Sequence, residues 1–152
     1  MMDVALVPTE EGIDIQLNSD GSDLLNEPGL ETAVIISIFS ERRVTEEELP
    51  DGETDKRGWW GDLLSDVQGD QIGSKLWTKR RAKATIANKL AIKEALRNCL
   101  LWMIEDGLAS SVEVDASFPK ASEILLKVDI QRPSGKNERY ALVWDGQSIK
   151  RG

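Results

Sequence analysis

The most distinctive side chains for chemistry or recognition lie in one segment, residues 56–77, which reads KRGWWGDLLSDVQGDQIGSKLW. It holds three of the five tryptophans and four of the twelve glycines. A tryptophan buries a large apolar area and keeps one N–H donor, and adjacent rings such as Trp59 and Trp60 cannot both face one core. Gly58 and Gly61 flank the pair and allow positive φ or a close backbone approach. The segment is therefore predicted to form a contact surface.

Three aspartates in the segment, Asp62, Asp66 and Asp70, follow one another at four-residue spacing. Paired carboxylates next to an aromatic platform are typical of glycoside hydrolysis, which requires the two groups to lie about 5 to 10 Å apart. Gly69 and Gly73 interrupt any helix that would align the acids. Solvated or ion-paired aspartates are the favoured interpretation, and glycan binding or cleavage is kept as an alternative hypothesis.

A basic cluster surrounds Trp77 and consists of Lys75, Lys79, Arg80, Arg81 and Lys83. Basic residues beside an aromatic ring can bind phosphates, so a small nucleic-acid-binding regulator is a third hypothesis. The chain as a whole carries a net charge of -8 and shows no DNA-binding motif, which favours an acidic protein surface as the partner. The candidate partner-binding residues are Arg57, Trp59, Trp60, Asp62, Lys75, Trp77, Arg80 and Arg81.

The composition excludes whole classes of catalysis. The chain has no histidine, the commonest general base and zinc ligand, and one cysteine, Cys99. A single cysteine cannot form an intramolecular disulfide, and no phosphate-binding loop, dinucleotide-binding turn or nucleophile elbow occurs. We expect no catalytic residue, cofactor, metal, nucleic-acid partner or membrane partner. The first 17 residues contain no basic region and no long apolar run, so we expect neither a secretory signal nor a membrane span.

The elements before the tryptophan segment are short. Residues 3–7 and 13–17 are predicted to form a hairpin, separated by Pro8 and Gly12. The following stretch, NSDGSDLLNEPG, has acids at the wrong spacing for a calcium loop and is predicted to turn. The β-branched residues of 30–39 would also suit a buried strand, but Pro28, Gly29 and Glu31 favour a helix entered after the proline, with one apolar face made by Leu30, Val34 and Ile38.

The clearest element is a long helix within residues 79–106. Thr85 is its predicted N-cap and Gly107 its predicted C-terminal cap. Apolar residues recur at helical spacing at Ile92, Leu96, Cys99, Leu100 and Met103, which places the cysteine in the core. Because CLLWMI is apolar on nearly every side, we expect this helix to be central and covered on more than one face.

The C-terminal part is predicted to form an antiparallel three-strand meander. Its strands are residues 111–118, 124–131 and 139–144, and Arg132–Asn137 makes the last turn. Alternation in VEVDASF and LKVDIQ directs one face towards the helix. The sequence thus predicts one compact α+β domain over residues 1–152, with a long central helix and a shorter helix packed on a small, mainly antiparallel sheet.

Several motifs in order resemble the small baseplate proteins of Mu-like contractile-tailed phages and prophages. These are LETAVIISIFSERR, LPDG, RGWWGD, GSKLW, LWMIEDGLA, VEV and VWDG. The RGWWGD and GSKLW pair is specific, because three tryptophans at this spacing between glycines rarely arise by chance. More distantly the chain is similar to the wedge or sheath-initiator proteins of contractile tails, although their Glu-Pro-Arg motif is absent.

The resemblance implies a non-enzymatic subunit of a sixfold-symmetric tail baseplate, located in the virion tail after assembly in the host cytoplasm. It implies binding to a larger wedge protein near the central hub and spike and the first sheath ring, by a protein that is monomeric alone. In this context the glycan alternative becomes a tail domain that binds or cleaves cell-wall glycan.

Overall fold

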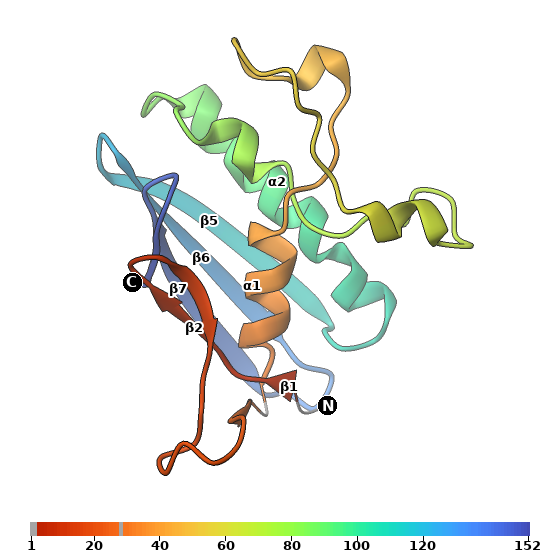
Figure 1. Cartoon of the computed structure of the whole chain (residues 1–152), viewed down its shortest axis with the longest axis vertical. Coiled ribbons are helices and arrows are strands. Elements are labelled where there is room, and N and C mark those ends of the chain that lie inside the picture. Colours follow the sequence, from red (N-terminus) through yellow and green to blue (C-terminus); the bar gives the residue numbers. More distant parts are fainter. Residues whose placement is uncertain (1–2, 28) are drawn as a thin grey trace.

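The computed structural model describes residues 3–27 and 29–152 and shows a layer of two helices on one face of an antiparallel sheet (Figure 1). The sheet has four strands in the order β5-β6-β7-β8. Their bounds are Ser111–Lys120, Glu123–Gln131, Asn137–Trp144 and Ile149–Arg151. The predicted α+β class and the meander are confirmed. Strand β8 was not predicted, because three residues are too short to show alternation.

Alternation in the strands directs one face of the sheet towards the helices, as predicted. Along β6, Ile124, Leu126, Val128 and Ile130 are buried, whereas Lys127 is exposed. Leu126 lies opposite Leu142 of β7, so the inward positions of neighbouring strands meet in one layer. The core therefore lies between this face and the helices.

The N-terminal strands form two small antiparallel pairs. β2 (Leu6–Thr9) pairs with β3 (Gly12–Ile15), and β1 (Asp3–Val4) pairs with β4 (Asn26–Glu27). The predicted hairpin is confirmed, but Pro8 does not separate its strands. It lies within β2 opposite Ile13, and the turn comes after Thr9. A proline is tolerated there because each strand of a two-stranded ribbon is an edge strand.

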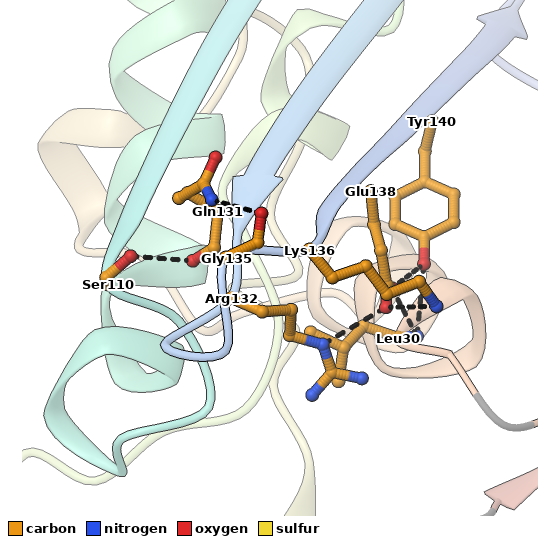
Figure 2. A network of polar contacts seen from close by, with 8 residues as sticks. All are labelled: Leu30, Ser110, Gln131, Arg132, Gly135, Lys136, Glu138 and Tyr140. Atoms are coloured by element: carbon orange, nitrogen blue, oxygen red, sulfur yellow. Dashed lines mark hydrogen bonds and ion pairs between the residues drawn. The ribbon is translucent and has the colours of Figure 1, made fainter.

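Helix α1 (Glu31–Phe39) follows the predicted pattern, with Leu30, Val34 and Ile38 fully buried. Its start is fixed by the buried carboxylate of Glu138 on β7 (Figure 2). The Leu30 N–H donates to Glu138 Oε2 at 3.1 Å and to the Tyr140 hydroxyl at 3.0 Å. Arg132 and Lys136, from the β6–β7 turn, lie 3.1 and 3.2 Å from Glu138 Oε1.

The charge of Glu138 is maintained by this network. Burial raises the pKa of Glu138, but hydrogen bonds from Tyr140, Arg132 and Lys136 outweigh it and lower the pKa to about 2. The carboxylate therefore stays ionised and joins α1 to the sheet.

Helix α2 (Ile86–Glu105) begins later than residue 79, because Leu76–Lys79 form a separate 3₁₀ turn, η3. Thr85 is the N-cap as predicted and accepts a hydrogen bond from the Asn88 N–H, and Gly107 has a φ of +74° beyond the C-terminus. All five predicted core residues are buried, and burial raises the pKa of the Cys99 thiol to about 12. As expected, α2 is covered on more than one side, by β5, α1 and η3, but its outer side is open, and there Leu101 and Ile104 are 42% and 38% exposed.

Candidate interaction surface around Trp59 and Trp60

Residues 40–74 form a long loop between α1 and η3, which we call the excursion. Its first and last residues lie side by side. The Ser74 N–H donates to the Ser40 carbonyl at 2.9 Å, and the Arg42 N–H donates to the Ser74 carbonyl at 3.0 Å. The Ser74 hydroxyl donates to the Ile38 carbonyl at the end of α1. Gly73 has a φ of +88°, and a Cβ there would collide with the Ser40 carbonyl oxygen. The base of the excursion is therefore tightly fixed to the core.

Trp77 anchors this base. Its ring is 6% exposed, and its Nε1–H donates to the Arg42 carbonyl at 2.9 Å. The Arg57 guanidinium lies over the ring at 4.4 Å from the centroid, which is within cation–π range. Arg57 also donates to Glu41, and Arg80 lies 3.3 Å from the same carboxylate. These contacts join both ends of the excursion.

Arg57 holds a backbone conformation that side chains other than glycine rarely adopt. Its φ is 54°, and in the described part of the chain no other residue except glycines has a positive φ. The Arg57 N–H donates to Asp55 Oδ1 at 2.8 Å. The strain is sustained by the contacts of this side chain with Trp77 and Glu41. The turn at Arg57 leads directly to Gly58 and the tryptophan pair.

Trp59 and Trp60 both face solvent, with exposed fractions of 52% and 69%. Their ring centroids are 5.6 Å apart and the rings are tilted by 49°, so they form one aromatic surface. Gly58 has a φ of +102°, and Gly61 lies under the Trp59 ring, where a Cβ would collide with it. The predicted positive φ and close approach are thus both present. The close approach at Gly61 is to a ring of the same chain.

The exposed apolar surface extends beyond the aromatic pair. Trp60 opens the 3₁₀ turn η2 (Trp60–Leu64), in which Leu63 and Leu64 are 84% and 72% exposed, and Val67 follows at 65%. We call these five side chains, Trp59, Trp60, Leu63, Leu64 and Val67, the Trp59–Val67 patch. The aliphatic members were not predicted, although an LL pair in a polar segment next to two tryptophans was an available signal. Contiguous exposed apolar surface of this kind is typical of binding sites.

The aspartates of the segment are not aligned on a helix. Asp62 Oδ1 accepts a hydrogen bond from the Ile72 N–H at 3.1 Å and so closes the loop that carries the patch. Asp70 Oδ2 accepts a hydrogen bond from Ser65, and Asp66 is exposed. Asp62 therefore positions the patch. A shallow cleft of about 570 Å³ lies next to Trp59 and is lined by Glu41, Asp55, Arg57 and Ile72, among others.

The basic candidates divide between internal and open positions. Lys75 pairs with Glu48, and Arg80 pairs with Glu41. Arg81 is exposed and makes no ion pair within residues 3–27 and 29–152. Of the eight candidate residues, Trp59, Trp60 and Arg81 thus have the most open side chains. Arg57, Lys75, Trp77 and Arg80 hold the excursion in place through contacts within the chain.

Two further features of the described residues concern metal ions and membranes. No group of three or more histidine, cysteine, aspartate or glutamate side chains there could hold a metal ion. Neither α1 nor α2 is both long and apolar enough to span a bilayer.

Comparison with known proteins assigns the chain to a family. The model of the family described as phage protein GP46 matches residues 30–137, which include α1, the whole excursion, α2, β5 and β6. The chain belongs to the phage protein GP46 family.

Two relatives of this family match almost the whole chain. The Mu-like prophage FluMu protein gp46 of Haemophilus influenzae is 38% identical over 139 residues, which cover 91% of this chain and 93% of the relative. The baseplate protein gp46 of Escherichia phage Mu is 35% identical over 136 residues, which cover 89% and 90%. The resemblance to Mu-like proteins inferred from the tryptophan motifs is confirmed.

Proposed function

We propose that this chain is a structural, non-enzymatic subunit of a contractile phage or prophage tail baseplate, where it acts as a small wedge adaptor. Its relative in phage Mu is named a baseplate protein, which supports this role. In the proposal the chain binds a larger wedge protein near the hub and the first sheath ring, in a sixfold-symmetric assembly. At low concentration in the host cytoplasm, before assembly, it is monomeric, and it resides in the virion tail afterwards.

The observation that carries the proposal is the exposed aromatic pair on a fixed base. Aromatic side chains on a preorganised surface lose little conformational entropy on binding and are frequent interface hot spots. Leu63 and Leu64 extend the apolar area next to the pair. The hydrogen bonds of Trp77 with Arg42 and of Asp62 with Ile72 keep the aromatic pair exposed in the free chain. A protein with a complementary apolar pocket is the partner that suits such a surface.

Co-expression with the larger wedge protein of the same tail operon tests this proposal. We expect a stable complex that co-purifies at low salt. Trp60→Ala should weaken binding by about 2 kcal/mol or more without unfolding the chain, because this ring is mostly exposed. Ile36→Ala, which truncates a half-exposed side chain on α1, is the matched control and should bind as the native chain does. Failure of the two native proteins to co-purify would contradict the proposal.

The glycan alternative is separated by a second assay with the same variants. An exposed aromatic pair could also stack on sugar rings, so the protein is incubated with peptidoglycan fragments. Under the baseplate proposal the protein stays in solution and releases no soluble sugar. Depletion from solution that Trp60→Ala abolishes would favour glycan binding.

A further inference from the structure

Charge is strongly segregated along the chain and across the molecule. Residues 1–40 contain eight acidic and no basic residues, whereas residues 71–93 contain seven basic and no acidic residues. A uniform surface charge would merely keep the protein soluble. Two patches of opposite sign on one chain can attract each other between copies.

The acidic patch lies on the N-terminal hairpin and the loop after it, residues 9–25, which we call the acidic arm. Its exposed acids are Glu10, Glu11, Asp14, Asp20 and Asp23. None of them forms an ion pair with any residue that the structure describes. The arm also exposes apolar side chains, since Ile15 and Leu17 are each 51% exposed and Leu24 is 39% exposed. It is therefore an acidic surface with an apolar component.

The basic patch lies on the outer side of α2 and the turn before it, which we call the basic face. Lys83 and Arg97 are exposed and, like the acids of the arm, have no ion-pair partner in the described ranges. Along the helix, Arg97 shares its side with one exposed acid, Glu94, and with four exposed apolar residues, because the spacing places them all within about a quarter of the helix circumference. The apolar residues are Ile86, Leu90, Leu101 and Ile104, with exposed fractions from 38% to 79%.

The two surfaces lie at opposite edges of the sheet, so an arm cannot reach the basic face of its own chain. Helix α2 packs over β5, whereas β2 of the hairpin packs beside β8 (Figure 1). The four-stranded sheet, with strands about 4.8 Å apart, separates them. A contact between arm and face therefore requires a second molecule.

We propose that the acidic arm of one copy of this chain docks on the basic face of the next copy. Both surfaces combine unpaired charge with exposed apolar side chains, so contact neutralises the charges around a buried apolar centre. Because the two surfaces differ, the contact is head-to-tail, and repetition gives a closed ring or an open filament. This contact is separate from the Trp59–Val67 patch and does not depend on which protein covers that patch.

Charge reversal in pairs tests the contact on the pure protein. The arm variant carries Glu10→Lys and Glu11→Lys, and the face variant carries Lys83→Glu and Arg97→Glu. Sedimentation is measured over a range of protein concentrations at about 0.01 M salt, where the Debye length is about 30 Å. We expect the native chain to form assemblies larger than one chain as its concentration rises. Each variant alone should raise the dissociation constant at least about tenfold, because the contact then loses two attractive charges and gains two that repel the facing surface.

The decisive result comes from mixing. An equimolar mixture of the arm and face variants should associate again, because the native arm of one variant then meets the native face of the other. All four substitutions in one chain should also restore association, because the reversed residues then face each other with opposite charge. Lys127→Glu with Arg139→Glu makes the same charge change on the outer face of the sheet and should leave association unchanged. The proposal is overturned if the native chain stays a single molecule at every concentration, if the reversals have no effect, or if the mixture does not associate.

Discussion

Trp77 and Trp60 show that position in the fold decides the role of a tryptophan. Both belong to the same glycine-rich segment, yet Trp77 is 6% exposed with its N–H bonded to Arg42, and Trp60 is 69% exposed. The sequence could predict that one of the adjacent rings Trp59 and Trp60 lies outside the core. It could not predict that both do, because the competing core ring comes from residue 77 through a contact over a long loop.

Truncating these two rings should therefore lower stability by very different amounts. Trp77→Ala should lower the free energy of unfolding by about 3 to 5 kcal/mol, because it leaves a cavity and removes the surface on which Arg57 packs. Trp60→Ala should change it by no more than about 0.5 kcal/mol. Urea denaturation of both variants measures this difference, and equal losses would contradict the assignment of anchor and exposed ring.

Glu138 should make the folded state sensitive to acid. Its pKa is about 2 in the folded chain, against an ordinary value of 4.5. Because the folded pKa is the lower one, this stabilisation is fully present above pH 4.5 and is lost as the pH falls towards 2. At neutral pH the shift corresponds to roughly 3 kcal/mol.

The matched variant for this prediction is Glu138→Gln. Lowered pKa values of Asp20, Glu48, Asp115 and Asp145 add to the acid sensitivity of the native chain, so the difference between the two proteins is the quantity to measure. We expect the native chain to be more stable at pH 7 and the difference to shrink between pH 4.5 and 2. A difference that does not vary with pH would show that the carboxylate charge contributes little.

At the scale of elements, the sequence predicted what periodicity and capping can reveal. Thr85 and Gly107 marked the ends of α2, and alternation marked β5, β6 and β7. Strand β8 and the pairing of β1 with β4 could not be predicted, because segments of two or three residues are too short to show alternation. The alternation that buries Leu142 also places Glu138 inward, so a buried acid beside Arg132 and Lys136 was open to prediction.

Replacing Gly73, at the base of the excursion, should lower stability far more than replacing Gly69, which lies further out in the same loop. Both residues have a positive φ, but a Cβ at Gly69 has no atom within 4 Å, whereas one at Gly73 collides with the Ser40 carbonyl. Gly69→Ala should cost about 1 kcal/mol of stability, from the strained backbone alone. Gly73→Ala should cost clearly more and weaken binding of the larger wedge protein. Thermal unfolding compares them, and similar losses would mean that the base tolerates displacement.

For the whole molecule, neither the Trp59–Val67 patch nor the charged surfaces contribute to the core. The core joins α1, α2 and one face of the sheet, and leaves the patch, the acidic arm and the basic face open at separate places. Charge blocks are readable in the sequence, but their placement at opposite sheet edges follows only from the order of β5 to β8. Such a distribution suits a protein with several neighbours.

Cryo-electron microscopy of the intact tail tests the central claim most directly. In the proposed role, this chain lies in the baseplate and the rings of Trp59 and Trp60 are covered by another baseplate protein. A tail that lacks the chain, or a baseplate in which both rings face solvent, would contradict it.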